Sequence, residues 1–424
     1  MPVQIAETLM GDSQPSVAVI APALPVNGAG GVASAHFNIH RCLRRVGCRT
    51  KLLTFNESER PGREPEVFRY GAGKRLRSLL AFGVHLYLKA IGSKNTAYQL
   101  TDIVSSFPGS LQVDHRLGRL CPDIIVIPDH GAPGLSLRNR GVPIILAVHH
   151  IPARFNADPV LGNYCPLDVA KATALEQRVL SRVAAVVCPS EYMKEMFLKT
   201  YAYDGEVTVI PNLVDQSSLE AIPAYDVRSE FGLSASVPVV YIPSAGSFFK
   251  GARYVFEIVR RLARRHEGAL VFYLSGPIDP ALRAELRYVP DNVLLFMPGK
   301  VSQETNVSYV KSCSFGVSPT LIESFGMAIL EASYCRVPMV TFAVGGTPEI
   351  VRNGENGFLV PFLDIEGLID SASKLLDSQY CDTLKKTTEA TIRNRFNADR
   401  IALQYLSLFE RCMRSGEKSE KGPV

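Results

Sequence analysis

Residues 318–361 read SPTLIESFGMAILEASYCRVPMVTFAVGGTPEIVRNGENGFLVP and decide the fold class. Short apolar runs at 315–318 and 338–342 are typical of buried strands, and 326–334, rich in Ala, Leu and Ile, is typical of a helix between them. A strand, a helix and a second strand in this order predict a unit of an α/β fold with a parallel sheet.

Two glutamates flank the start of the predicted helix. Glu323 lies in the loop before it, and Glu331 lies about two turns into it. A helix that begins near Gly326 aims unpaired backbone N–H groups and the positive end of its dipole at this loop, which favours a bound diphosphate. Because carboxylates accept strong hydrogen bonds from hydroxyls, we expect one of the two to bind hydroxyls of a sugar and the other those of a ribose. The spacing alone also fits two solvated surface charges.

The same run resembles the E-x7-E signature of the family 4 retaining glycosyltransferases, and the later GG-T-PE-I-V and N-G-F-L-V-P text matches that family too. The resemblance covers about the whole chain. It implies a GT-B fold, in which two Rossmann-like domains face a central cleft and a C-terminal helix crosses back to the first domain. The acceptor domain would be 1–214 with the helix at about 394–413, and the donor domain 215–393. Residues 414–424 are expected to form a disordered tail.

The second domain opens with an apolar strand at 238–243, followed by the place of the family pattern G-R-L-x3-K-G. Lys250 and Gly251 match that pattern, so the resemblance implies that Lys250 neutralises the donor diphosphate. Ala245 stands where the family has Arg. A cation at that point is worth several kcal/mol in the transition state. Arg253 is one alternative source of charge, helix N–H groups are another, and weak catalysis is the third.

The first half alternates apolar strands with helices, as a parallel sheet requires. A glycine loop precedes the predicted helix at 32–46, and backbone there can approach a ligand closely. The predicted strands are 16–21, 49–54, 123–128, 143–148 and 184–188. The strand at 143–148 ends in two histidines, which places imidazoles at the carboxyl edge of the sheet, where such folds bind ligands.

The remaining site residues are implied by the resemblance. The segment AVHH resembles the T-V-H strand end of the family, which makes His149 a candidate for contact with the donor sugar. The catalytic residues implied are Glu323, Lys250 and His149. The donor-binding residues implied are Gly30, Gly31, Gly246, Gly251, Gly299, Val301, Ser324, Phe325, Gly326, Met327, Ala328 and Glu331.

The activity implied is hexosyltransferase-like. A sugar would move from a nucleoside-diphosphate sugar to an acceptor hydroxyl with retention of configuration, in glycan, glycolipid or natural-product biosynthesis. No D-x-D triplet occurs in the chain, and we expect a metal-independent enzyme with no cofactor besides the co-substrate. A catalytically weakened subunit that binds nucleotide sugar and supports a partner transferase stays open because of Ala245. An epimerase or phosphorylase on the same fold is a third possibility.

Composition fits a globular enzyme, with 46% hydrophobic and 21% charged residues in 424. A net charge of +5 without a basic stripe of interleaved aromatics argues against nucleic-acid binding. The sequence has no apolar run long enough to span a membrane and no secretory signal pattern, so a cytoplasmic location is expected. The oligomeric state is not predicted.

Residues 73–94 place basic side chains around an apolar centre. Two interpretations stay open. The segment is either an amphipathic helix that rests on anionic lipid at the inner face of the membrane, or a basic, partly buried helix inserted in the first domain.

Overall fold

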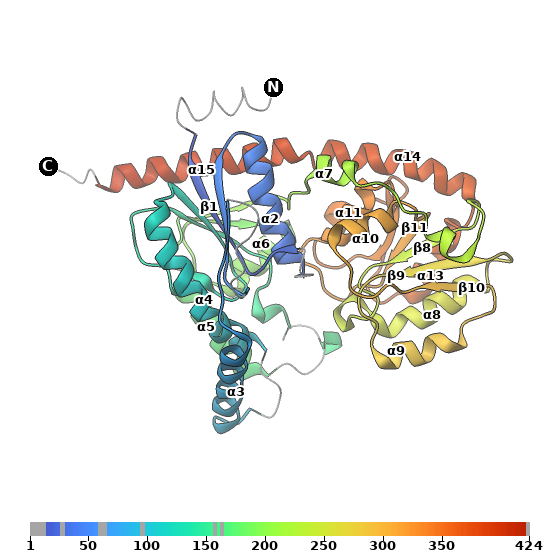
Figure 1. Ribbon diagram of the computed structural model, residues 1–424, viewed down its shortest axis with the longest axis horizontal. Coiled ribbons are helices and arrows are strands. Elements are labelled where there is room, and N and C mark those ends of the chain that lie inside the picture. Colours follow the sequence, from blue (N-terminus) through green and yellow to red (C-terminus); the bar gives the residue numbers. More distant parts are fainter. Residues whose placement is uncertain are drawn as a thin grey trace. The chain divides into compact units, whose positions relative to one another are not determined.

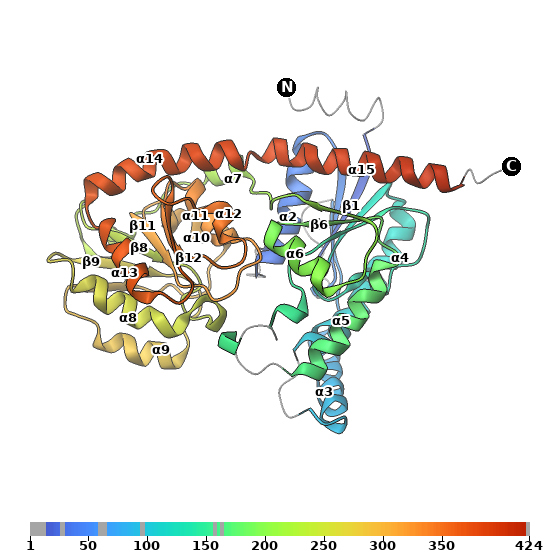
Figure 2. The ribbon, with the colours of Figure 1, turned by 180° about the vertical axis from the view of Figure 1, so that it is seen from behind.

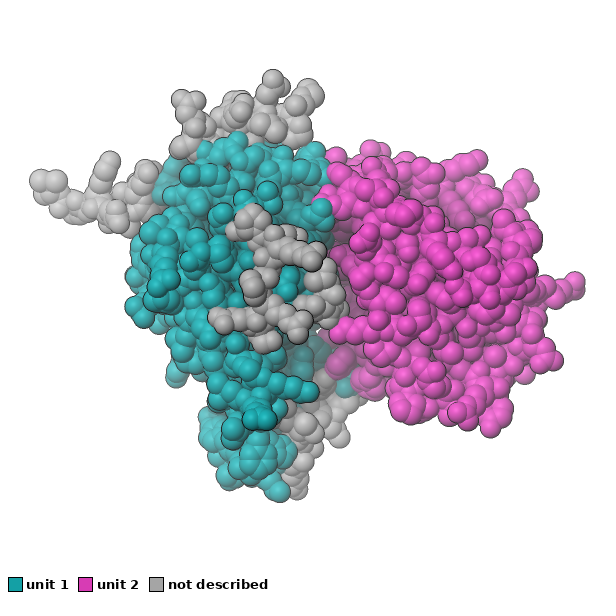
Figure 3. All heavy atoms as spheres, in the orientation of Figure 1, with its two compact units in different colours: residues 1–213, 398–424 teal, residues 214–397 magenta. Residues whose placement is uncertain are grey.

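The computed structural model describes residues 14–25, 30–57, 66–93, 98–155, 159–161 and 165–420. The chain divides into two compact units (Figure 3). Residues 1–213 with 398–424 form unit 1, and residues 214–397 form unit 2.

Unit 1 is built on a parallel sheet with the strand order β3-β2-β1-β4-β5-β6-β7 (Figures 1 and 2). Its strands are β1 (Ser16–Ala21), β2 (Arg49–Thr54), β3 (Val67–Arg69), β4 (Ile124–Pro128), β5 (Ile144–Ala147), β6 (Ala185–Cys188) and β7 (Glu206–Val209). Its longer helices are α2 (Gly30–Arg45), α3 (Lys74–Ala90), α4 (Gln99–Leu120), α5 (Pro166–Leu180), α6 (Glu191–Thr200) and α15 (Ala398–Glu420).

Successive side chains along each strand of unit 1 point to opposite faces of the sheet, and both faces are buried. Ala18 and Ile20 of β1 join a core that includes Val113 of α4 and Val179 of α5. The helix α2 packs on β1 and β2 and contacts α15. Burial on both faces explains why these strands are continuous apolar runs.

Unit 2 is built on a second parallel sheet, with the order β10-β9-β8-β11-β12-β13. Its strands are β8 (Val239–Ile242), β9 (Leu270–Leu274), β10 (Val293–Phe296), β11 (Phe315–Ser318), β12 (Met339–Phe342) and β13 (Gly357–Val360). Its helices are α7 (Gln216–Ala221), α8 (Ala252–Ala263), α9 (Pro280–Glu285), α10 (Gln303–Val310), α11 (Met327–Tyr334), α12 (Thr347–Ile350), α13 (Ile365–Lys374) and α14 (Ser378–Arg395).

The helix α8 shows how the sequence builds this unit. Val255, Ile258, Val259 and Leu262 recur at helical spacing, and all four are fully buried against the sheet. The two parallel sheets confirm the predicted α/β class with Rossmann-like units.

The C-terminal segment differs from its predicted bounds. The helix α14 ends at Arg395 in unit 2, and α15 begins at Ala398 in unit 1. In unit 1, α15 contacts α2, and Arg411 pairs with Glu206 at 2.6 Å. The helix continues to Glu420, so the tail predicted from 414 is helical over most of its length, and 421–424 lie outside the described residues.

In each sheet the strand order reverses at one point, which is where ligands bind in open α/β folds. In unit 1 this point lies between β1 and β4, and in unit 2 between β8 and β11. The loops that leave β8 and β11 carry Lys250 and Glu323.

Among the described residues, no helix has both the length and the apolar composition needed to span a membrane.

Candidate active site

Lys250 and Glu323 meet at the reversal point of unit 2. Lys250 Nζ donates a hydrogen bond to a carboxylate oxygen of Glu323, and the pair is partly exposed. Their loops are also joined by backbone, because Leu321 N donates to Phe249 O at 2.9 Å. The structure therefore brings together two of the three predicted catalytic side chains.

Gly251 lets these two loops approach each other. Its φ of +79° lies in the left-handed region, and an added Cβ would lie 2.0 Å from the carbonyl oxygen of Pro319. It ends the turn that carries Lys250 and is the N-cap of α8, so α8 begins directly after Lys250 and its loop. Gly246 faces a similar restriction, since its Cβ would lie 2.2 Å from Pro277 O. Both glycines thus have a packing role whether or not they touch a ligand.

The glycine pair Gly345 and Gly346 supports the loop of Glu323. A Cβ on Gly345 would lie 1.8 Å from Glu323 O, and one on Gly346 would lie 2.7 Å from Ser324 O. The GG-T-PE segment is thereby explained, because its glycines allow one loop to lie directly on the backbone of the other.

We expect Gly345→Ala to cost about 2 kcal/mol or more of stability, because the new Cβ meets backbone that cannot rotate away and φ is +57°. Its matched control is Gly354→Ala, at φ +75° with no described atom within 4 Å, which should cost only about 1–2 kcal/mol of left-handed strain. Thermal unfolding measures both. Equal losses would show that Gly345 does not support the Glu323 loop.

Glu331 lies on α11, whose N-cap is Gly326. Its carboxylate accepts a hydrogen bond from Gln303 Nε2 at 2.6 Å. Gln303 is the first residue of α10, directly after the loop that carries Gly299 and Val301. Burial raises the pKa of Glu331 to about 7, and the hydrogen bond from Gln303 opposes that shift.

This pKa predicts a pH dependence of nucleotide binding. Above pH 7 Glu331 is ionised and accepts hydrogen bonds from hydroxyls, whereas below pH 7 it is protonated and loses acceptor strength. For the predicted contact of Glu331 with ribose, affinity for a nucleotide sugar, whose diphosphate does not titrate in this range, should therefore rise between pH 6 and pH 8. Calorimetric titration of Glu331→Gln should give affinity about tenfold weaker at pH 8 and little pH dependence. Glu304→Gln, at an exposed neighbour on α10, should keep the rise, and a rise that survives in Glu331→Gln would exclude Glu331 as its source.

Ala245 is fully buried in the core of unit 2. Its N–H donates to Ser275 O at 2.9 Å. Arg253, the alternative source of charge, is exposed on the first turn of α8 and stacks over Phe248 and Tyr254, with distances of 5.1 and 5.4 Å to the ring centroids. Lys250 therefore provides the cation in the loop that precedes α8.

His149 lies at the carboxyl end of β5 in unit 1 and is buried. Its ring meets that of His36 edge to face, with centroids 5.3 Å apart. Among described residues, Nε2 of His149 and both ring nitrogens of His36 lack a hydrogen-bond partner. Burial lowers the pKa of both rings, that of His36 to well below its usual range, so both are neutral at pH 7.

Asp129 holds the backbone around His149. Its two carboxylate oxygens accept hydrogen bonds from the N–H groups of His130, His149, His150 and Ile151, at 2.7 to 3.2 Å. The side chain of His150 has a separate position, with Nε2 at 2.6 Å from Gln99 Oε1. Asp129 thus fixes the strand end from which His149 projects.

Further predicted site residues lie in two places, at the start of α2 and at the start of α11. Gly30 is the first residue of α2, and a Cβ on it or on Gly31 would meet no described atom within 4 Å, so both present open backbone. Phe325 is buried and packs against Phe396, which leaves only its backbone for a ligand. Met327 and Ala328 begin α11.

Three residues of the site, Asp129, His36 and Gln303, were not predicted from the sequence. Asp129 follows an apolar strand directly, and a polar residue at that point was the available signal. His36 lies six residues after Gly30 on the same helix, and its proximity to His149 depends on tertiary packing. For Gln303 the signal was the helix start after Ser302, which caps α10.

Two family models match the chain. The model described as Glycosyltransferase Family 4 matches residues 29–218, and the model described as Glycosyl transferases group 1 matches residues 238–378. Together they cover most of both units. The chain belongs to the family 4 glycosyltransferases with a GT-B fold.

Two related proteins share only low sequence identity with the chain. The chain is 21% identical over 270 residues to the N-acetyl-alpha-D-glucosaminyl L-malate synthase of Bacillus anthracis, which covers 62% of this chain and 66% of that protein. It is 27% identical over 259 residues to the D-inositol 3-phosphate glycosyltransferase of Mycolicibacterium smegmatis, which covers 59% and 58%. The chain thus spans about three-fifths of the length of these relatives.

Solved structures share the fold over nearly the whole chain. Sucrose-phosphate synthase from Thermosynechococcus elongatus superposes with a TM-score of 0.72 at 19% identity, covering 95% of this chain and 100% of that chain. HepE of Anabaena, solved in complex with UDP and glucose, superposes with a TM-score of 0.65 at 17% identity, covering 94% and 100%.

Proposed function

We propose that this protein is a retaining, metal-independent glycosyltransferase that moves a hexose from a nucleoside-diphosphate sugar to an acceptor hydroxyl. The observation that carries the proposal is the Lys250 to Glu323 pair at the reversal point of unit 2, with Glu331 on the following helix. Family membership supports glycosyl transfer, and the complex of HepE with UDP and glucose supports a nucleotide sugar as donor.

In the proposed reaction each side chain has one task. Lys250 and the first N–H groups of α8 and α11 stabilise the charge that develops on the departing diphosphate. Glu323 accepts hydrogen bonds from hydroxyls of the sugar, and Glu331 from those of the ribose. Unit 2 binds the donor and unit 1 the acceptor, while His149 contacts the sugar. The acceptor hydroxyl attacks the face from which the diphosphate leaves, and the leaving phosphate takes its proton.

Ala245 favours one second candidate, a weakened subunit that binds nucleotide sugar for a partner transferase. The buried methyl group of Ala245 leaves the loop before α8 with Lys250 as its cation. Binding without turnover would be the signature of such a subunit.

The test begins with thermal-shift measurements on UDP, GDP and ADP and their sugars, because a ligand that binds the folded state raises its melting temperature. The sugar nucleotide that stabilises the protein is then incubated with it and with cell-derived acceptors, and release of nucleoside diphosphate is followed. Release coupled to formation of a glycoside supports the enzyme. Tight binding without turnover would favour the subunit, and a lack of binding by all donors would overturn both.

We propose further that α3 contacts a membrane that contains anionic lipid. It extends away from the sheet of unit 1 (Figures 1 and 2). Val84 and Leu88 bury against α4 and α5, whereas Leu79 and Phe82 are 68% and 60% exposed. Further exposed apolar residues on this helix are Leu76, Leu86 and Tyr87, and the basic residues on the same side of the helix are Arg75 and Lys89. An apolar stripe flanked by cations suits the surface of an anionic bilayer.

Co-sedimentation with vesicles tests this contact. Wild type should bind vesicles that contain phosphatidylglycerol more strongly than pure phosphatidylcholine. The double substitution Leu79→Ser with Phe82→Ser should weaken binding by about tenfold or more, because two apolar side chains no longer enter the lipid. Leu198→Ser, at an exposed leucine on α6, should bind like wild type. Equal binding of the double variant would refute the contact.

A further inference from the structure

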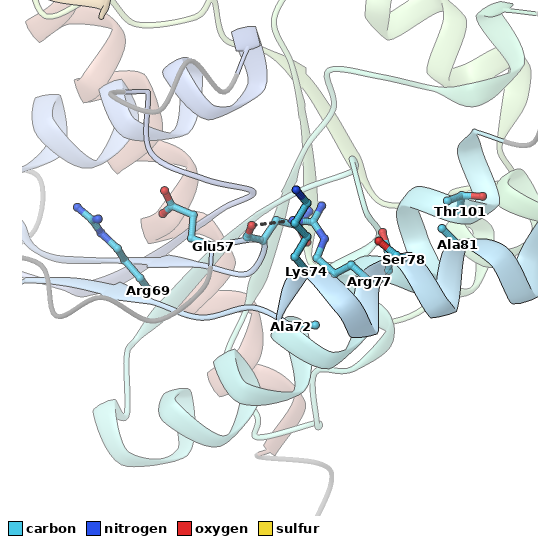
Figure 4. Close-up of a pocket in the computed structure, with 10 residues that line it drawn as sticks. Glu57, Arg69, Ala72, Lys74, Arg77, Ser78, Ala81 and Thr101 are labelled. Carbon is cyan, nitrogen blue, oxygen red and sulfur yellow. Dashed lines mark hydrogen bonds between the residues drawn. The ribbon is translucent and has the colours of Figure 1, made fainter.

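Unit 1 contains a cavity of about 700 Å³ between α3, α4 and the ends of β2 and β3 (Figure 4). Its walls are polar. The residues that line the cavity are Asn56, Glu57, Arg69, Ala72, Lys74, Arg77, Ser78, Ala81, Thr101 and Ser105. This volume is within the range of pockets that hold small molecules. None of the residues predicted for the donor site lines it.

The charged side chains that line the cavity come from three elements. Lys74 and Arg77 project from the first turn of α3, Arg69 comes from the end of β3, and Glu57 follows β2. In Figure 4 the charged ends of these side chains point toward the same side of the view. Three cations and one carboxylate line the cavity, and a second carboxylate, that of Asp102 on α4, interacts with Arg77, so the charge balance is positive and favours an anion.

A hydrogen bond to backbone holds Arg77 in place. Arg77 Nη1 donates to Asn56 O at 3.1 Å, and Asn56 Nδ2 donates to Ser106 Oγ at 2.9 Å, which joins α3 and α4 through Asn56. No described carboxylate forms an ion pair with Arg69, Lys74 or Arg77. Arg69 Nε is buried and lacks a hydrogen-bond partner among described residues.

We propose that this cavity binds the phosphate group of the acceptor. The inference rests on the proposed function and names the class of its second substrate, a hydroxyl compound that carries phosphate. A phosphate offers three strong acceptor oxygens, which match the guanidinium and ammonium donors and the hydroxyl of Ser78. The first turn of α3 holds no acidic residue and adds the positive end of the helix dipole. Glu57 adds an acceptor for hydroxyls of the same compound.

Binding of inorganic phosphate tests the site directly, without any need for turnover. Calorimetric titration compares wild type with Arg69→Gln combined with Lys74→Gln. The control is Arg119→Gln, an exposed arginine on α4 that does not line the cavity. We expect the double variant to bind phosphate at least about tenfold more weakly and the control to stay within about twofold. Lys250→Gln measures how much phosphate binds at the donor site instead. Absence of binding to wild type, or equal binding by the double variant, would overturn the proposal.

Transfer assays then separate the two sources of such a phosphate. One arm uses soluble pairs, glucose 6-phosphate with glucose and glycerol 3-phosphate with glycerol. The other uses phosphatidylserine vesicles that carry a minor fraction of either phosphatidylinositol or diacylglycerol, so that both members of the pair offer α3 an anionic surface. We expect the phosphorylated member to be preferred in at least one arm, and the double variant to lose that preference through a higher acceptor KM. Equal use of both members in both arms would refute the proposal.

Failure of the donor role is distinguishable from failure of this site. Thermal stabilisation by the nucleoside diphosphate should be unchanged in the double variant, because its two positions lie in unit 1 and the donor residues Lys250 and Glu331 in unit 2. If the wild-type protein did not bind the donor, only the proposed function would be refuted. The phosphate titration tests the cavity independently of the donor.

Discussion

Replacing Lys250 by alanine is expected to lower kcat by about 10²- to 10³-fold while donor affinity falls much less. Lys250 is the one charged residue in the segment 243–251, because Ala245 stands where the family has Arg. A lysine near the leaving diphosphate interacts more strongly as negative charge builds up in the transition state, so its loss affects turnover more than binding. Steady-state kinetics with the donor identified by thermal shift provides the measurement.

Two controls make the Lys250 result specific. Lys386→Ala removes an exposed lysine from α14 of the same unit and should keep wild-type kcat. Lys250→Ala also leaves Glu323 without its cation, so Glu323→Gln in the Lys250→Ala background tests whether that uncompensated charge causes the loss. If kcat of Lys250→Ala matched that of Lys386→Ala, the diphosphate would lie elsewhere.

Replacing Asp129 by alanine is expected to give the largest loss of stability, about 3 kcal/mol or more. The four N–H groups that its carboxylate accepts would lose their partner in a buried segment, and each unsatisfied group costs about 1–3 kcal/mol. With roughly 2–4 °C per kcal/mol for a unit of this size, the melting temperature should fall by about 6–12 °C. Because the same hydrogen bonds fix the strand end, transfer should also slow as His149 moves.

The matched control lies at the other end of the same strand. Asp123 precedes β4 and accepts a single backbone hydrogen bond, from Ser16 N at 2.7 Å, at an exposed position. Asp123→Ala should lower the melting temperature by only a few degrees. If both variants had the same melting temperature, the hydrogen bonds of Asp129 would contribute little to the stability of unit 1.

Much of the fold could be predicted because a strand that is buried on both faces is a continuous apolar run in the sequence. The bounds of β1, β2 and β11 coincide with the predicted runs. The helix α4 does not have such a clear sequence pattern, because Pro108 and Gly109 lie within it and this dipeptide is typical of a turn. Tertiary packing explains the exception, because a Cβ on Gly109 would lie 1.8 Å from Phe55 O and only glycine allows α4 to pass there.

The candidate site was predicted in unequal parts. Lys250 and Glu323 were identified through motifs, and the structure adds that they pair with each other. Asp129 and Gln303 act through contacts with residues 20 and 28 positions away, which spacing within one element cannot reveal. The cavity between α3 and α4 could not be found in the sequence either, because Arg69, Lys74 and Thr101 belong to three elements that only the fold brings together.

The central claim is sugar transfer with retention, and the configuration of the product tests it most directly. The donor that stabilises the protein is incubated with it and an acceptor, and the anomeric coupling constant of the new glycoside is read by proton NMR as nucleoside diphosphate is released. We predict one glycoside per diphosphate, with the anomeric configuration of the donor. An inverted glycoside, or release of diphosphate with free sugar as the sole product, would contradict the account.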